Sequence, residues 1–423
     1  MASAIHVVSK KDLAQHEVVP VNISLPALAP SSIRARSSLV AITSNNLTYA
    51  KLGDFVHWWS TWPVPADAPA PYNNKDEWGI VPAWGFGRAL ESNVDSLPAG
   101  SLLYGFWPTS SHIVDLKLAT HDPKTRFREV SEHRQALGSM YNEYSLVDET
   151  ARSDDSRALF ANAYSIWNAG YVLNRFCFPT EYKPAHPFGV YGGEWTDSDG
   201  DLSAAVLVNL SASSRTGRSS TWNFTRNRKP GVNGPLALLC ATSSPKVLEP
   251  APQAPFEVNS VSYDGLTAGE TVAWIGKFEP KRVVVLDHGA PLATTERFVE
   301  ALSEALPETQ TTLVMIGVEP KMGTADELVA LLGSKRQSRS TVELNTTFVI
   351  DIGFATEGGQ KFFEENEKAF NSAVEEKYLG DLELVKGDGV SGSGGVEGAW
   401  ENLIQGTLAP SKAWVYQLDG KSQ

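Results

Sequence analysis

The chain has 423 residues, of which 42% are hydrophobic, and this length exceeds that of a usual single domain, so we expect two domains. Its 49 acidic residues outnumber 36 basic ones, and the net charge of -13 would repel a nucleic-acid backbone or an anionic bilayer. We therefore expect the protein to bind neither nucleic acid nor a membrane surface, and to act on a small-molecule substrate.

The two cysteines, Cys177 and Cys240, are too few for a disulfide framework or a structural zinc site. The eight histidines show no metal-ligand spacing, so we expect no bound metal. The first residues, M-A-S-A-I-H-V-V-S-K-K-D-L, lack the apolar run of a secretory signal, and no later segment is apolar enough to span a bilayer. These features predict a cytoplasmic protein with reduced, buried thiols.

Short apolar runs separated by Pro and Gly fill the first third of the chain. Their spacing indicates short strands and turns, and hence a β-rich domain. From about Ser156 to Leu173, apolar residues recur at helical spacing, which predicts a helix that bridges two domains.

The pattern changes after about residue 200 to apolar strands separated by polar connections, as in A-A-V-L-V-N-L and R-V-V-V-L-D-H-G. Continuous apolar runs suit strands that are covered on both faces, as in a doubly wound parallel sheet. An amphipathic helix is predicted from Phe362 to Tyr378. The final block predicts a helix that ends near Gly406, followed by a turn and a last strand.

Five short motifs occur in order along this pattern. They are N-N-L-T-Y at 45–49, W-G-F at 84–86, Y-G-F-W-P at 104–108, H-R at 133–134 and Y-N-E-Y at 141–144. Together with the order of the predicted parts, they resemble the medium-chain dehydrogenase/reductase superfamily, close to its quinone and enoyl reductases. Within it, they resemble a branch catalogued as a family of unknown function, which has a serine-rich turn in place of the usual glycine-rich loop.

The resemblance implies an α/β fold with a Rossmann-like doubly wound parallel sheet domain and a β-rich GroES-like domain. The implied limits are a GroES-like substrate domain at 1–155, a dinucleotide-binding domain at 156–355 and a C-terminal segment returning to the first domain at 356–423. The resemblance is also compatible with a homodimer.

The stretch S-A-S-S-R-T-G, residues 211–217, follows a buried strand where a phosphate-binding turn is expected. Small side chains leave backbone N–H groups accessible to a pyrophosphate, and hydroxyls and arginine add donors. The residues we expect at the phosphates are Ser211, Ser213, Ser214, Arg215 and Thr216. The alternative is that these residues only cap the helix that follows.

The next strand ends in C-A-T-S-S-P-K, where a nicotinamide-binding fold meets the adenosine ribose. No acid is nearby to bind a 2′-hydroxyl, which favours NADPH, and the expected 2′-phosphate ligands are Thr242, Ser243, Ser244 and Lys246. An ordinary polar turn is the alternative. Asp287, in D-H-G-A-P at 287–291, is expected to face the nicotinamide.

The resemblance implies a metal-free reaction, in which a donor polarises a substrate carbonyl as hydride reaches the β-carbon. Tyr49 is the first candidate donor and Asn46 would orient substrate or nicotinamide, while Tyr144 and His57 are further candidates. Each of these residues has a structural alternative, such as a strand aromatic for Tyr49. The many aromatic residues of the first domain predict either a pocket for an aromatic or polyenic substrate or a domain core.

The sequence therefore predicts a metal-free NADPH-dependent reductase of an activated C=C bond or quinone, in secondary metabolism of the polyketide type. One alternative is a non-redox isomerase, cyclase, lyase or hydrolase of a ketonic or polyketide-like substrate on the same fold, and another is a binding protein without turnover. The missing glycines favour the non-redox enzyme, in which the cofactor site is degenerate or absent.

Overall fold

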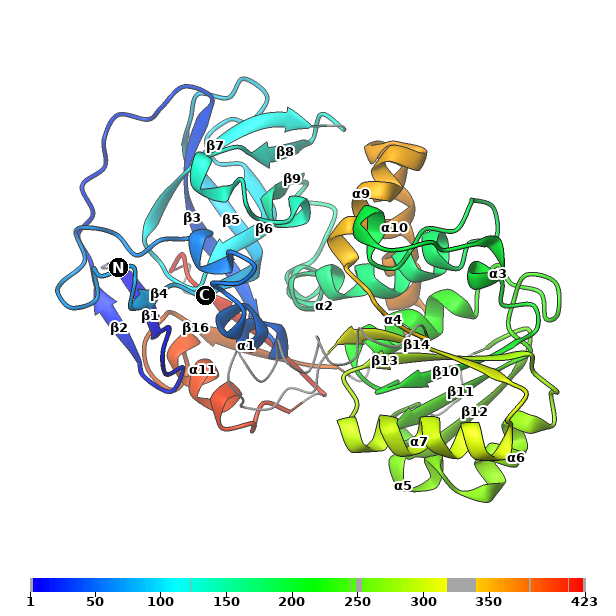
Figure 1. The fold of residues 1–423 in the computed structure, drawn as a ribbon. Helices are drawn as coiled ribbons and strands as arrows, with labels where there is room; N and C mark the ends of the chain where they lie inside the picture. The colour runs from blue at the N-terminus through cyan, green and yellow to red at the C-terminus, as the bar shows by residue number, and fades with distance from the viewer. Residues whose placement is uncertain are drawn as a thin grey trace. The chain divides into compact units, whose positions relative to one another are not determined.

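We describe a computed structural model of the protein (Figure 1). The structure describes residues 3–121, 123–243, 245–248, 253–317, 340–379, 382–409 and 411–420. These residues form two compact units: unit 1 contains 3–165 and 382–420, and unit 2 contains 166–317 and 340–379. The domain limits expected from the sequence stay predictions.

Unit 1 contains a β-barrel. Its main sheet consists of β3 (Ser32–Ile42), β5 (Pro82–Ser92), β6 (Leu102–Pro108), β7 (Ile113–His121), β8 (Arg126–Glu129), β9 (Glu143–Val147), β16 (Glu383–Asp388) and β17 (Lys412–Gln417). The strand order is β16-β17-β3-β5-β6-β9-β8-β7, and a further pairing of β3 with β7 closes the barrel. This closure is possible because residues 32–36 of β3 pair with β7, while residues 39–42 pair with β17.

A small sheet and several helices complete unit 1. They are β1 (Ala4–Ser9), β2 (His16–Pro20), β4 (Trp78–Gly79), α1 (Ser44–Lys51), α11 (Val396–Ile404), η1 (Trp58–Ser60), η2 (Glu132–Arg134) and η3 (Ser139–Asn142). The helix expected from about Ser156 to Leu173 is confirmed as α2 (Asp154–Val172), which begins in unit 1 and ends in unit 2. The predicted helix, turn and strand near the C-terminus are confirmed as α11 and β17.

Unit 2 is built on a parallel six-stranded sheet. Its strands are β10 (Ala205–Leu210), β11 (Ala237–Thr242), β12 (Glu257–Ser262), β13 (Arg282–His288), β14 (Gln310–Gly317) and β15 (Thr341–Glu343). Their spatial order is β12-β11-β10-β13-β14-β15, with every neighbouring pair parallel. In chain order this is 3-2-1-4-5-6, the arrangement of the Rossmann fold. The predicted Rossmann-like sheet and β-rich domain are thus confirmed.

Helices cover both faces of this sheet. The helices of unit 2 include α3 (Asp197–Gly200), α4 (Arg215–Phe224), α5 (Tyr263–Leu266), α6 (Gly269–Gly276), α7 (Leu292–Ala305), α9 (Thr346–Glu357), α10 (Gly359–Glu375), η4 (Leu173–Cys177), η5 (Gly189–Tyr191) and η6 (Pro245–Leu248). Figure 1 shows α5, α6 and α7 on one face and α4 on the other. The predicted helix at 362–378 corresponds to α10, which begins a turn of helix earlier.

The core of unit 2 explains why its strands have continuous apolar sequences. Val206, Val208 and Leu210 of β10 pack in one cluster with Phe298 of α7 and Ile275 of α6. The residues between them point to the opposite face, because side chains alternate along a strand. All six residues of β10 are buried, so both faces are covered. Burying one large apolar side chain of this kind contributes about 1.5–3 kcal/mol.

In the part of the chain that the structure describes, no helix combines the length and the apolar character needed to cross a membrane.

Candidate functional site

The sheet of unit 2 has a topological switch point between β10 and β13. The chain leaves β10 toward β11 on one side, and β13 begins the half of the sheet on the other side. In folds of this order, ligands bind outside the carboxyl ends of the strands at such a point. The turns after Leu210 and His288 therefore form the candidate nucleotide site.

The turn after β10 begins with a left-handed residue and leads directly into a capped helix. Ser211 has a left-handed backbone with φ of 56°, a conformation that glycine adopts most easily. Ser214 caps α4, because its Oγ accepts a hydrogen bond from the N–H of Gly217 at 3.0 Å. A Cβ on Gly217 would lie 2.4 Å from the carbonyl oxygen of Ser211. Gly217 therefore corresponds to the glycine that, in a glycine-rich turn, lets the helix pack closely on the strand.

The serine hydroxyls of this turn have partners within the protein. Ser211 Oγ lies 2.8 Å from Tyr263 Oη, and Ser213 Oγ lies 2.5 Å from Thr242 Oγ1. Ser214 uses its oxygen as an acceptor in the cap, which leaves its O–H able to donate to a ligand. For Ser214, capping and phosphate binding are therefore compatible.

Two further residues expected at the phosphates, Arg215 and Thr216, are half-buried in the first turn of α4. The first N–H groups of a helix have no acceptor within the helix and carry the positive end of its dipole. Arg218, by contrast, is buried and donates from Nε to the carbonyl oxygen of Ser213 at 2.9 Å. Its guanidinium thus contacts the backbone of the turn.

The segment after β11 carries the residues expected at a 2′-phosphate. Thr242 is the last residue of the strand, and Ser243 and Lys246 follow it with exposed side chains. Ser244 lies outside the described residues. No acidic residue occurs at 242–248, where NAD-binding sites place the carboxylate that binds a ribose 2′-hydroxyl.

Asp287 lies within β13 rather than in the loop after it. Its buried carboxylate accepts hydrogen bonds from the N–H groups of Gly289 at 3.0 Å and Ala290 at 2.8 Å. Thr295 Oγ1 donates a third bond at 3.0 Å. These hydrogen bonds hold the connection from β13 to α7 in place. They give Asp287 a structural role that requires no contact with a nicotinamide.

His288 is a buried residue that the sequence analysis did not select. Its Nδ1 lies 3.2 Å from the carbonyl oxygen of Leu210, and its Nε2 lies 2.7 Å from Ser220 Oγ. Burial lowers the pKa of the imidazole to about 4. The ring is therefore neutral at physiological pH, with Nδ1–H donating to the carbonyl and Nε2 accepting from the Ser220 hydroxyl. Its place at the end of a strand in D-H-G was the only sequence signal.

Tyr49 of unit 1 lies in an aromatic cluster. Its ring centroid is 4.7 Å from that of Trp58 and 5.1 Å from that of Phe106, and Trp84 Nε1 donates to its hydroxyl at 3.2 Å. Burial raises the pKa of Tyr49 to about 12, against the opposing effect of hydrogen bonds with Trp84 and Asn45. The phenol is thus protonated at neutral pH and can donate.

The segment that carries Tyr49 is a helix, rather than the strand considered as the structural alternative. Asn46 stabilises the start of this helix, because its Oδ1 accepts a hydrogen bond from the N–H of the N-cap residue Thr43 at 2.8 Å in a capping box. Its Nδ2 donates to the carbonyl oxygen of Pro82 at 2.9 Å. Asn46 is buried, and both ends of its amide have structural partners.

Tyr144 and His57 have contrasting environments. Tyr144 is fully buried, its hydroxyl donates to the carbonyl oxygen of Phe106 at 2.8 Å, and it accepts from Arg134 Nη1 at 3.1 Å. Because its single proton is used, the geometry favours a structural role. His57 is exposed, with a left-handed φ of 63°, and precedes η1. The four expected catalytic residues all belong to unit 1.

A family model described as "Protein of unknown function (DUF2855)" matches residues 40–409. The chain belongs to this family. This confirms the predicted membership of a family of unknown function. No curated protein matches the chain.

Solved structures similar to this DUF2855 protein share its fold at low sequence identity. A mutant form of enoyl thioester reductase from Candida tropicalis has a TM-score of 0.52 and 9% identity, covering 99% of this chain and 100% of that one. CurA from Vibrio vulnificus in complex with NADPH has a TM-score of 0.51 and 9% identity, covering 98% and 99%. At this identity, the likeness shows the fold alone.

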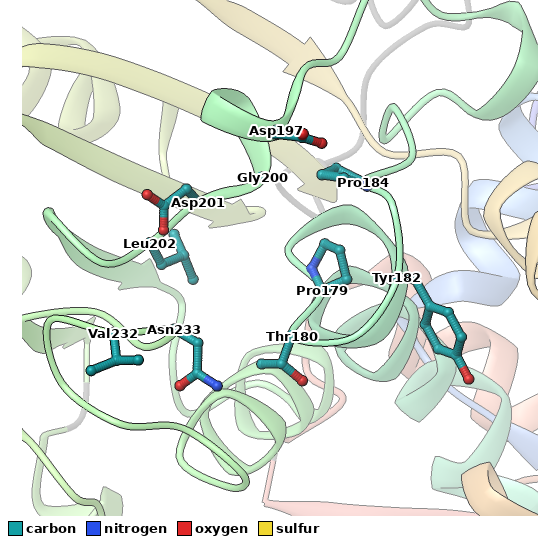
Figure 2. Close-up of a pocket in the computed structure, with 10 residues that line it drawn as sticks. All are labelled: Pro179, Thr180, Tyr182, Pro184, Asp197, Gly200, Asp201, Leu202, Val232 and Asn233. Atoms are coloured by element: carbon teal, nitrogen blue, oxygen red, sulfur yellow. The ribbon is translucent and has the colours of Figure 1, made fainter.

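The DUF2855 chain also has a surface cavity of about 220 Å³ in unit 2 (Figure 2). Its lining residues are Pro179, Thr180, Tyr182, Pro184, Asp197, Gly200, Asp201, Leu202, Val232 and Asn233. Asp201 and Leu202 precede β10, and Asn233 precedes β11, so the cavity lies near the amino ends of these strands. It is separate from the turns at the carboxyl ends, and no residue expected at a site lines it.

The described residues contain no group of three or more His, Cys, Asp or Glu side chains that could hold a metal ion. Cys177 and Cys240 are both buried, and burial raises the pKa of each thiol. Neither has the low-pKa surroundings of a reactive thiolate.

Proposed function

We propose that this protein is a metal-free, NADPH-dependent reductase of an activated C=C bond or a quinone. The observation that carries the proposal is the turn after β10. Ser211 has the left-handed backbone of a glycine, Ser214 caps the helix, and Gly217 allows its close approach to the strand. Such a turn directs backbone N–H groups and a helix N-terminus at a pyrophosphate. The similar structures include an enoyl thioester reductase and a complex with NADPH.

The residues of the proposed cofactor site fall into two groups. The turn at 211–216 would hold the pyrophosphate through the backbone N–H groups of α4 and the hydroxyl of Ser214. Thr242, Ser243, Ser244 and Lys246 would hold the 2′-phosphate through hydroxyl and ammonium groups. When bound, NADPH supplies a hydride.

Tyr49 is the proton donor of the proposal, or the group that polarises the substrate carbonyl. Its raised pKa keeps the phenol protonated, and the N–H of Trp84 fixes the position of its oxygen. The rings of Trp58 and Phe106 pack against the ring of Tyr49, which is buried, and in such low-dielectric surroundings a hydrogen bond to a developing negative charge is stronger. The aromatic surroundings favour an aromatic or polyenic substrate, in keeping with polyketide-type metabolism.

A non-redox activity on a ketonic substrate is the second candidate. It is favoured by the hydrogen bonds of Ser211 to Tyr263 and of Ser213 to Thr242, since these hydroxyls already have partners before any ligand binds. Tyr49 could polarise a carbonyl in that reaction as well.

Calorimetric titration of the full chain with NADPH separates the two candidates. The reductase requires saturable binding of NADPH, and it requires NADPH oxidation with at least one member of a panel of enones and quinones. Absence of NADPH binding would refute the reductase. Binding of NADPH without oxidation by any of these acceptors would refute the proposed substrate classes.

A further inference from the structure

The turn after β10 holds a serine in a conformation that normally favours glycine. A left-handed backbone is unfavourable for a residue with a Cβ, and it persists only where the surrounding structure enforces it. At Ser211, φ is 56°, and the position begins the proposed phosphate turn. The backbone hydrogen bonds of the turn and the side chains that bond to the backbone around it can both contribute to this enforcement.

Two buried side chains bond to the far side of the turn. Asn209 Nδ2 donates to the carbonyl oxygen of Gly217 at 2.8 Å and to Thr221 Oγ1 at 2.6 Å. Arg218 Nε donates to the carbonyl oxygen of Ser213 at 2.9 Å. These bonds fix the end of the turn and the start of α4, but neither reaches the carbonyl that precedes Ser211.

His288 is the side chain that reaches that carbonyl. It extends from the end of β13, holds the carbonyl oxygen of Leu210 with Nδ1, and holds Ser220 of α4 with Nε2. The pairing of β13 with β14 shifts register between Asp287 and His288, an irregularity of the kind that redirects side chains near functional sites. One rigid ring thus connects the end of β10, the end of β13 and α4.

We propose that His288 is a positioning residue for NADPH binding, which holds the Leu210–Ser211 backbone and α4 in the geometry that glycines provide in a glycine-rich turn. The identity of the ligand in this inference, NADPH, rests on the proposed function. The shape of the turn does not depend on the ligand and can be measured without it.

The chemistry of the ring defines the variants. A neutral imidazole offers one donor and one acceptor, and a glutamine amide offers both kinds of group. His288→Gln can therefore restore the two bonds, whereas His288→Ala removes both. Ser220→Ala removes only the bond to α4.

The first measurement is amide hydrogen exchange of the full chain without ligand. The N–H of Ser214 donates to the carbonyl oxygen of Ser211, and the N–H of Ala212 donates to that of Ala241, so both report on the turn. We expect His288→Ala to speed exchange at both amides by tenfold or more, with His288→Gln close to the wild type.

The matched control is His112→Ala, because His112 is a buried histidine of unit 1 that has a similarly lowered pKa. It should lower stability while leaving exchange at the turn and NADPH affinity unchanged. If His112→Ala speeds exchange at these amides as much as His288→Ala, the effect is general loosening and the proposal is overturned.

The second measurement is the dissociation constant for NADPH. We expect His288→Ala to weaken binding by tenfold or more, and Ser211→Gly added to this variant to recover most of the loss, because glycine adopts the left-handed backbone without help. No recovery in the double variant would overturn the proposal, as would unchanged exchange at Ser214 and Ala212.

The two hypotheses fail in distinguishable ways. If the wild type does not bind NADPH but His288→Ala still loosens the turn, the proposed function is overturned and with it the ligand named here. If the wild type binds NADPH and His288→Ala binds it equally well, the inference about His288 is overturned and the proposed function stands. Should His288→Ala fail to fold, Ser220→Ala decides the matter: faster exchange at Ser214 and Ala212 with weaker NADPH binding supports the inference, and unchanged exchange and affinity overturn it.

Discussion

Gly217 is the position at which a single added methyl group tests the geometry of the turn after β10. It lies in the first turn of α4, and a Cβ there would be 2.4 Å from the carbonyl oxygen of Ser211 and 2.8 Å from the Cα of Ala212. Both are backbone atoms, which cannot rotate out of the way as the end of a side chain can. Gly217→Ala should therefore push α4 away from the end of β10.

Two opposing effects set the size of the change in stability. Overpacking of a tight site costs about 1–3 kcal/mol, and alanine regains about 1 kcal/mol over glycine within a helix. The contact with Ser211 is far inside the normal limit, so the upper part of the first range applies and the net loss is about 1–2 kcal/mol. For a domain of this size, the melting temperature should fall by roughly 2–8 °C.

Gly269 provides the matched control. It is the first residue of α6, and a Cβ there would meet nothing within 4 Å. Scanning calorimetry of the wild type, Gly217→Ala and Gly269→Ala should show a lowered melting temperature for Gly217→Ala alone. NADPH affinity should also fall by tenfold or more in that variant. If the two variants behave alike in both measurements, α4 does not approach the strand as closely as described, and the argument for a phosphate cradle fails.

Three other predictions concern the remaining candidate residues and the response to acid. Tyr49→Phe should lower kcat and kcat/KM together by about 10²–10⁴-fold, and it should also lower the melting temperature because Trp84 Nε1 loses its acceptor; a lowered melting temperature with intact turnover would make Tyr49 a packing residue. Lys246→Ala should weaken NADPH binding by about 10–100-fold in calorimetry and leave NADH binding nearly unchanged, and an equal effect on both nucleotides would contradict a 2′-phosphate contact. Burial lowers the pKa of His6 to about 3 and that of His112 to about 4. In the unfolded chain, each histidine takes up a proton below its ordinary pKa of about 6.5, whereas in the folded protein it stays neutral. The free energy of unfolding, measured by urea titration, should therefore fall as the pH drops from 6.5, by about 2 kcal/mol per histidine at pH 5, and His112→Gln should reduce this slope. An unchanged slope in His112→Gln would refute the assignment.

The parallel sheet could be predicted from sequence because its signal is local. The residues of β10 form a continuous apolar run, and such runs separated by helices have few solutions other than a parallel sheet with covered faces. The barrel of unit 1 could be predicted only as a β-rich domain. Its closure depends on β3 pairing with β7 along one half and with β17 along the other, and nothing in the sequence of β3 specifies two partners.

The candidate site shows the same limit at the level of single residues. The helix that carries Tyr49 begins with a capping box in which Asn46 replaces the usual Glu or Gln, so the familiar sequence signature is absent. The bonds of Tyr144 to the carbonyl oxygen of Phe106 span 38 positions, and those of His288 to Leu210 span 78. Hydrogen bonds over such separations depend on the folded sheet and leave no periodic pattern in the sequence.

Unit 1 is formed by two segments that lie far apart in the chain, residues 3–165 and 382–420, and this has a consequence for folding during synthesis. The hydroxyl of Ser38, in β3, donates to the carboxylate of Asp419 across 381 positions of the chain, and β17 pairs with β3 beside this contact. At a translation rate of about 5–20 residues per second, the nascent β3 waits roughly 20–75 s before its partner strand leaves the ribosome. Throughout this interval, the strand has an open edge, where another nascent chain can pair with it. Crowded polysomes should therefore be where this protein aggregates, and a chaperone that binds nascent chains should increase the yield of folded protein.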